Sequence, residues 1–144
     1  MKIEKIDHVA ILVKDAEKAI KLFSDLFEMK FDAIGKIKDM DAKSWIAASG
    51  VEIIQPVNTD GITARTLNTR GEGLSLLSLK VSNLSEAMSE MESRGIRQIA
   101  KMNDNGIKIA LYHPKDTFGV MIELIEYETE HDIVTAAKNR KLVT

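Results

Sequence analysis

The sequence predicts an α+β fold built from two βαβββ modules that follow one another along the chain. The main observation is an internal repeat: residues 7–19 align with residues 75–87 without a gap, and each stretch has the pattern of a strand followed by a helix. A second match places GVEII at 50–54 over MIELI at 121–125. The offset between the copies is 68 residues at the first match and 71 at the second, so they differ by about three residues in one hairpin loop.

The first module begins with an alternating stretch over residues 3–13, which predicts a strand with apolar side chains on both faces. Asp15 then offers a side-chain cap, and apolar residues recur at helical spacing down to Glu28. Three further extended stretches complete the module, at residues 31–35, 42–48 and 51–56.

The second module repeats this order. A strand is expected over residues 74–81, and Asn83 with Glu86 three positions later resembles a capping box at the start of a helix. Gly95 is expected to end that helix. Extended stretches follow at residues 97–102, 107–113 and 120–127.

The length of 144 residues fits a single domain with one cooperative core. We expect modules over about 1–60 and 71–128, joined by a short helix and linker in GITARTLNTRGEG. A C-terminal helix is expected over 129–144, with a packing or dimer-contact role.

The composition excludes several classes of function. The 20 basic and 22 acidic residues are interspersed and give a net charge of −2, so no broad basic field is present to bind nucleic acid. The chain has no cysteine, which excludes disulfides and thiolate sites and is compatible with a reducing cytoplasm. No apolar run approaches the roughly 18 residues that a membrane span needs. We therefore expect a cytoplasmic protein without nucleic-acid or membrane partners.

Strand alternation places several polar side chains on the face turned away from the helices. In the first strand, the side chain of His8 is on the face opposite to that of Val9, and Lys80 has the same parity as His8 in the second copy. A charged side chain such as Lys80 on this face indicates a solvated hollow. Glu52 and Glu123 occupy equivalent positions in the fourth strands and share that face. A carboxylate in the middle of an apolar strand is costly unless it is paired or binds a metal.

One imidazole and two carboxylates suit Zn, Mn, Co, Ni or Fe and do not choose among these metals. From the residues alone, two interpretations stay open. The three side chains form a metal site, or both glutamates pair with nearby Lys or Arg while His8 is a hydrogen-bonded interior histidine.

Three segments together resemble a known family. DHVAILVKDAEKAIKLFSDLF, TLNTRGEGLSLLSLKVSNLSEAM and YHPKDTFGVMIELIE are similar to the vicinal oxygen chelate superfamily, also called the glyoxalase, bleomycin-resistance and dioxygenase superfamily. Within it, the methylmalonyl-CoA epimerases are the most similar. The resemblance implies that two βαβββ modules form a cup-shaped mixed sheet, with helices outside and a divalent metal inside.

The resemblance also implies where the ligands lie. Relatives supply a histidine from the first strand, a glutamate or glutamine from the fourth, a histidine from the strand after GEGL, and a glutamate from the last strand. The corresponding residues in this chain are His8, Glu52, Leu76 and Glu123. Because leucine cannot coordinate a metal, two outcomes stay open: a three-ligand site with water at the fourth position, or a cup that binds small molecules without metal.

An epimerase would abstract a proton next to a thioester carbonyl and return it to the opposite face, with electrostatic help from the metal. Glu123 is the favoured catalytic residue and Glu52 the less favoured one. No second base is assigned: Asp39 and Asp41 are candidates, although turn residues of this kind are more often solvated. The residues expected to contact the substrate are Ala10, Leu76, Ser78 and Lys80.

Alternative functions follow from the same residues. An extradiol dioxygenase needs a second histidine, which Leu76 removes, whereas a glyoxalase-type lyase tolerates other ligand mixtures and stays open. A metal-free binding or resistance protein is the alternative that Leu76 favours. The partners implied by the resemblance are a small molecule, such as an acyl-CoA, and a second copy of the chain in a homodimer.

Overall fold

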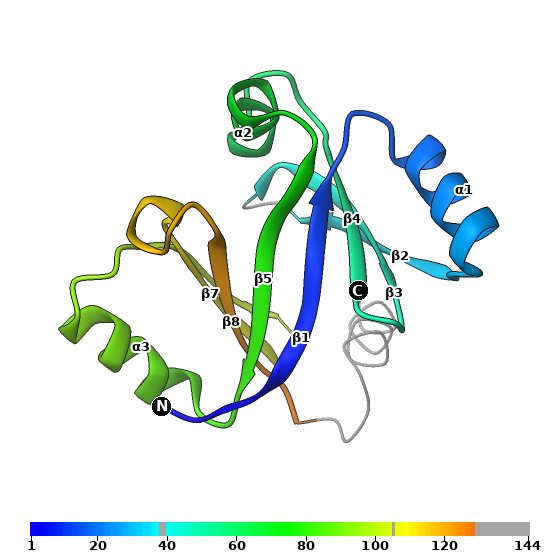
Figure 1. Ribbon diagram of the computed structural model, residues 1–144. Coiled ribbons are helices and arrows are strands. Elements are labelled where there is room, and N and C mark those ends of the chain that lie inside the picture. Colours follow the sequence, from blue (N-terminus) through cyan, green and yellow to red (C-terminus); the bar gives the residue numbers. More distant parts are fainter. Residues whose placement is uncertain (38–39, 105, 129–144) are drawn as a thin grey trace. The chain divides into compact units, whose positions relative to one another are not determined.

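The computed structural model describes residues 1–37, 40–104 and 106–128 (Figure 1). The elements follow the predicted order, with one βαβββ set, a short helix, and a second βαβββ set. The first set comprises β1 (Ile3–Leu12), α1 (Ala16–Phe27), β2 (Phe31–Ile37), β3 (Ala42–Ala47) and β4 (Val51–Pro56). Helix α2 (Ile62–Arg70) follows. The second set comprises β5 (Gly73–Val81), α3 (Leu84–Ser93), β6 (Gln98–Asp104), β7 (Ile107–Tyr112), the 3-10 turn η2 (Pro114–Asp116) and β8 (Met121–Glu126).

Both predicted helix caps are confirmed. Asp15 accepts a hydrogen bond from the Lys18 amide at 3.0 Å, and Asn83 accepts one from the Glu86 amide at 3.0 Å. These contacts satisfy amides that have no partner inside the helix, so each helix starts where its capping residue stands. The predicted C-terminal helix over 129–144 lies outside the described residues, and so does Asp39.

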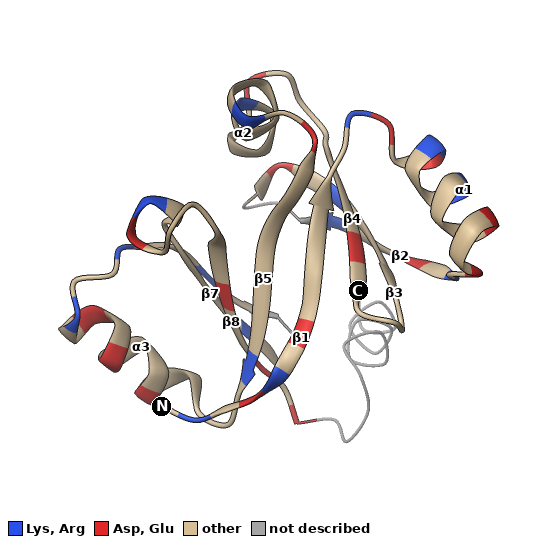
Figure 2. Ribbon diagram, viewed as in Figure 1, with Lys and Arg blue, Asp and Glu red and all other residues tan. Residues whose placement is uncertain are grey.

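The chain divides into two compact units. The first unit consists of residues 9–75. Its strands lie in the order β2-β3-β4-β1; β1 is parallel to β4 and the other neighbours are antiparallel. Helix α1 covers one face of this sheet and packs its apolar side against a cluster that includes Ile11, Val13 and Ile53. Basic and acidic residues both occur on the rest of α1 (Figure 2).

The second unit consists of residues 1–8 and, within the described part of the chain, residues 76–104 and 106–128. Its strands lie in the order β5-β8-β7-β6, again with one parallel pair (β5 and β8) and two antiparallel pairs. Helix α3 packs on one face, where Leu79, Val81 and Leu124 belong to the apolar cluster beneath it. Among the described residues, no helix has the length and apolar character needed to cross a membrane.

The apolar clusters confirm the predicted side-chain parity. Ile53 of β4 and Leu124 of β8 pack under the helices of their own units. Their strand neighbours Glu52 and Glu123 therefore lie on the opposite face of each sheet. Each unit thus carries one glutamate, buried in the middle of a strand, on the face opposite the one that packs under α1 or α3.

Candidate functional site

A buried polar cluster surrounds Glu123 in the second unit. Strands β5 and β8 pair in a register that sets Ser78 opposite Glu123, and the Ser78 hydroxyl donates to Glu123 Oε1 at 2.6 Å. His8 Nε2 lies 3.5 Å from the same oxygen. Their exposed fractions are 0% for Ser78 and 5% for both His8 and Glu123. The structure thus brings together two of the three predicted metal ligands.

A second carboxylate, that of Asp7, contacts the other ring nitrogen of His8. Asp7 Oδ1 lies 2.8 Å from His8 Nδ1, and the Tyr127 hydroxyl donates to Asp7 Oδ2. The Asp7 side chain is fully buried. Burial alone raises the pKa of Asp7, but the hydrogen bonds from His8 and Tyr127 outweigh it and hold that pKa below its usual value of 3.8. Asp7 is therefore ionised at neutral pH.

The charge on Asp7 decides which ring nitrogen of His8 carries a proton. An ionised carboxylate can only accept hydrogen bonds, so Nδ1 is the protonated nitrogen. In the neutral ring, Nε2 then turns its lone pair toward Glu123 Oε1. Two electron-rich atoms facing one another are stabilised by positive charge between them, either a proton on Nε2 or a cation. One imidazole nitrogen beside one carboxylate oxygen therefore fits a divalent transition metal in its donor chemistry.

Glu52 lies in the first unit and has a different partner. The Ser44 hydroxyl from β3 donates to Glu52 Oε1, and Glu52 is 6% exposed. Its register partner on β1 is Ala10, which has no hydroxyl to offer. In the part of the chain that the structure describes, no three His, Cys, Asp or Glu side chains are grouped as metal ligands. The role of Glu52 as a third ligand stays a prediction.

The predicted substrate contacts differ in their surroundings. Ala10, Leu76 and Ser78 are buried, and the Ser78 hydroxyl is bonded to Glu123. Lys80 is partly buried: its Nζ lies 3.3 Å from Glu4 and 4.3 Å from the centre of the Tyr127 ring. Contact of these residues with a substrate stays a prediction.

Asp41 is the candidate base whose position the structure describes, and its carboxylate has a partner of its own. Asp41, in the left-handed region with φ of +51°, accepts two hydrogen bonds from the Asn58 side chain at 2.7 and 2.8 Å. It joins the loop to the segment after β4, which is a structural role.

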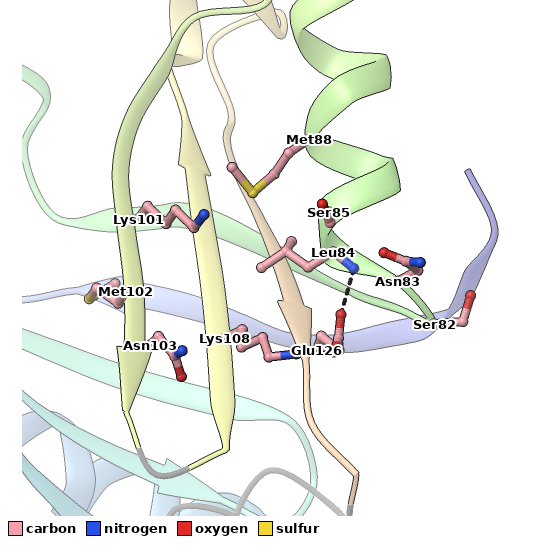
Figure 3. A pocket seen from close by; sticks show the side chains of 10 residues that line it. All are labelled: Ser82, Asn83, Leu84, Ser85, Met88, Lys101, Met102, Asn103, Lys108 and Glu126. Atoms are coloured by element: carbon pink, nitrogen blue, oxygen red, sulfur yellow. Dashed lines mark hydrogen bonds and ion pairs between the residues drawn. The ribbon is translucent and has the colours of Figure 1, made fainter.

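A cavity of about 360 Å³ in the second unit lies apart from the predicted site residues, none of which lines it (Figure 3). It is bounded by the start of α3 and by Lys101 and Lys108 from the neighbouring strands. Glu126 already accepts from the Leu84 amide and from Lys108 Nζ, both at 2.6 Å. Two groups that would attract an anion here, the Leu84 amide and the Lys108 ammonium, are thus occupied by Glu126.

Three residues of these clusters were not predicted from the sequence: Asp7, Tyr127 and Ser44. Asp7 directly precedes His8, and an acid in an apolar strand is a signal of its own. Strand alternation, however, directs neighbouring side chains to opposite faces, so contact between Asp7 and His8 was not expected. Tyr127 is 120 residues away from Asp7 along the chain, and no sequence pattern links the two.

Comparisons with known proteins agree with this architecture. A model of the Glyoxalase/Bleomycin resistance protein/Dioxygenase superfamily matches residues 7–118. The mitochondrial methylmalonyl-CoA epimerase of Mus musculus is 26% identical over 130 residues, covering 85% of this chain and 73% of that protein.

Solved structures of epimerases have the same fold. The methylmalonyl-CoA epimerase of Mycobacterium tuberculosis superposes with a TM-score of 0.79 at 26% identity, over 89% of this chain and 91% of that chain. A Streptomyces coelicolor methylmalonyl-CoA epimerase, in complex with 2-nitronate-propionyl-CoA, gives the same TM-score at 17% identity, over 89% of this chain and all of that chain. The fold is glyoxalase-like, and with the superfamily model matching most of its length, the chain belongs to the Glyoxalase/Bleomycin resistance protein/Dioxygenase superfamily.

Proposed function

We propose that the protein is a methylmalonyl-CoA epimerase-like isomerase that moves a proton at the carbon next to a thioester carbonyl. The observation that carries this proposal is the buried pair of His8 and Glu123, with Ser78 on the carboxylate and Asp7 on the ring. A carboxylate buried this deeply is retained at a cost, which proton transfer or cation binding explains.

Glu123 is the proposed catalytic base. Ser78 donates to its Oε1 and so fixes the plane of the carboxylate, while burial keeps bulk water from competing for the proton. The proposed metal ligands are His8, Glu123 and Glu52. A divalent metal (Co, Zn, Mn, Ni or Fe), when bound, supplies positive charge that stabilises the negative charge developing beside the thioester.

The proposed substrate is a small acyl-CoA, and methylmalonyl-CoA is the first compound to test because the similar proteins named above are epimerases of that thioester. The experiment incubates purified protein with methylmalonyl-CoA in D2O, with each divalent cation in turn, and follows deuterium incorporation at the acidic carbon by mass spectrometry.

The expected result is cation-dependent exchange that Glu123→Gln abolishes. Glu126→Gln is the matched control, because Glu126 lies on the same strand but bonds to Lys108 and the Leu84 amide instead. Exchange no faster than without protein, under every cation, contradicts the proposal.

A second candidate, a metal-free small-molecule binding protein, is favoured by one residue. Leu76 stands where relatives supply a histidine, and it is 4% exposed. Elemental analysis of the purified protein and ligand titration in a chelator separate the two candidates. Undiminished binding without metal, together with absent exchange, favours the binding protein.

We also propose that the protein forms a homodimer and resides in the cytoplasm. Light scattering on the purified protein tests the first statement, and cell fractionation tests the second.

A further inference from the structure

Asp7 has a geometry that the proposed proton transfer does not use. Its side chain is fully buried, and each of its two oxygens has a separate partner: Oδ1 meets His8 Nδ1 at 2.8 Å, and Oδ2 accepts from the Tyr127 hydroxyl at 2.5 Å. Lys5 Nζ lies 3.9 Å from Oδ2, but its side chain is 46% exposed, so its contribution is weak. The residues that determine the position of Asp7 are therefore His8 and Tyr127.

The ring of His8 needs such a partner to adopt one orientation. The second side-chain torsion of histidine is broad, so packing alone does not decide which ring edge faces Glu123. A flip of the ring would exchange a nitrogen for a carbon beside Glu123 Oε1. The hydrogen bond to Asp7 holds Nδ1 on one side and thereby leaves Nε2 on the other, 3.5 Å from Glu123.

Tyr127 in turn restrains Asp7. Because the Tyr127 hydroxyl occupies Oδ2, Oδ1 is the oxygen that faces the imidazole. Tyr127 is 4% exposed, and the Lys80 ammonium lies 4.3 Å from the centre of its ring, a cation–π distance. Glu4 pairs with Lys80 at 3.3 Å. A continuous series of contacts thus runs from Lys80 through Tyr127 and Asp7 to His8.

We propose that Asp7 is a positioning residue, restrained by Tyr127, which holds His8 in the tautomer protonated on Nδ1 and turns Nε2 toward Glu123. This inference rests on the proposed function for the statement that Nε2 is the atom offered to a metal. The tautomer itself is a property of the metal-free protein. Carboxylates that orient ligating histidines in this way commonly change metal affinity by about 10- to 100-fold when they are removed.

The first measurement needs no metal and no substrate. Two-bond 15N–1H correlation spectra of protein labelled with [15N]histidine distinguish the two neutral tautomers, and His8→Ala assigns the His8 signal among the three histidines. At alkaline pH, where histidine rings are ordinarily neutral, we expect the pattern of a ring protonated on Nδ1. Asp7→Asn, which keeps the shape and removes the charge, is expected to give mixed tautomers.

Asp116→Asn is the matched control. Asp116 is another aspartate of the second unit whose carboxylate is paired with a neighbour, Arg97, at 2.7 Å. Asp116→Asn makes the same chemical change in a different ion pair, so the His8 signal should not change. A wild-type ring protonated on Nε2, or an Asp7→Asn spectrum identical to wild type, overturns the proposal.

The second measurement is a calorimetric titration with Co²⁺. Asp7→Asn is expected to weaken binding by about 10- to 100-fold, Tyr127→Phe by less, and Asp116→Asn not at all. If wild type binds no Co²⁺ while the tautomer result holds, the metal in the proposed function is wrong and the positioning role stands. If Asp7→Asn fails to fold, Tyr127→Phe decides: an unchanged tautomer ratio overturns the proposal.

Discussion

The two units each stabilise a buried glutamate by hydrogen bonding, but they use different residues to do so. Each buries one glutamate in the middle of its fourth strand, at positions that match in the internal repeat, and each gives that glutamate a serine hydroxyl. In the second unit the serine is Ser78, which lies opposite Glu123 on the parallel neighbouring strand β5. The corresponding residue of the first unit is Ala10, so Glu52 takes its hydrogen bond from Ser44 on β3.

The two units differ in their histidine content. Residues 9–75 contain no histidine, whereas the second unit places His8 beside Glu123 with Asp7 and Tyr127 behind the ring. A serine satisfies a buried carboxylate by hydrogen bonding alone, while an imidazole adds a group that can carry a proton or ligate a metal. The proposal of proton transfer at Glu123 rests on this imidazole and on the hydroxyl of Ser78.

The largest expected effect comes from exchanging each glutamate for glutamine. Glu123→Gln removes the proposed base, and loss of a general base typically costs about 10²- to 10⁴-fold in rate. Glu52→Gln is expected to reduce the rate less, through weaker metal binding. Initial rates of deuterium incorporation into methylmalonyl-CoA, at one fixed metal concentration that does not saturate the site, compare the two variants. Equal losses, or a larger loss for Glu52→Gln, would show that the asymmetry between the units is not functional.

The second prediction concerns the position where the repeat pairs histidine with leucine. Leu76→His introduces the imidazole that relatives carry, and a buried unpaired polar group should lower the free energy of unfolding by about 1–3 kcal/mol without metal. Added Co²⁺ is expected to restore stability, by about 2.7 kcal/mol at a hundred times the dissociation constant. Urea unfolding with and without Co²⁺ measures both changes.

Leu79→His is the control for this experiment. Leu79 is on the same strand, but it packs against the apolar cluster beneath α3. It should lose stability in the same way and regain nothing from Co²⁺. Equal recovery in both variants would mean that the metal binds elsewhere.

The third prediction compares the two serines. Ser78→Ala and Ser44→Ala each leave a buried carboxylate short of one hydrogen bond, which costs about 1–3 kcal/mol of unfolding free energy. Only Ser78→Ala is expected to slow deuterium exchange as well, because Ser78 orients the proposed base. Unfolding in urea and exchange rates, measured on the same preparations, separate the two effects. Slower exchange in Ser44→Ala alone would reverse the assignment.

Much of the fold could be predicted from the sequence. The repeat between residues 7–19 and 75–87 set the element order, and the side-chain parity of residues such as Ile53 and Leu124 gave the faces that the helices cover. These features follow from local periodicity, which a single sequence displays directly.

The hydrogen-bond partners in the candidate site could not be predicted from the sequence. Alternation put Glu123 and His8 on the correct kind of face, but it says nothing of side-chain torsions. The bond between Asp7 and His8 contradicts the rule that neighbours on a strand point apart, and the contact of Tyr127 depends on tertiary structure. Ser44 was missed because its diagonal contact with Glu52 depends on register rather than on spacing.

The smallest expected effect is the change in unfolding free energy when each of the two tyrosines, both buried in the second unit, is replaced by phenylalanine. Tyr127→Phe removes a donor from Asp7 and is expected to lower the unfolding free energy by about 1 kcal/mol at neutral pH. The Tyr112 hydroxyl is the one buried side-chain polar atom without a hydrogen-bond partner among the described residues, so Tyr112→Phe should be neutral or slightly stabilising.

The pH dependence of the unfolding free energy further distinguishes Tyr127→Phe from Tyr112→Phe. The pKa of Asp7 is lowered in the folded protein, so its ionised form contributes stability above its usual pKa of 3.8, and that contribution is lost as the pH falls through the lower folded value. The deficit of Tyr127→Phe should therefore shrink in urea unfolding experiments taken from neutral pH down to about pH 3, while Tyr112→Phe keeps a constant offset. A Tyr127→Phe deficit that stays constant with pH would show that the hydroxyl acts through packing and not through the charge on Asp7, and the series of contacts that ends at His8 would lose its electrostatic basis.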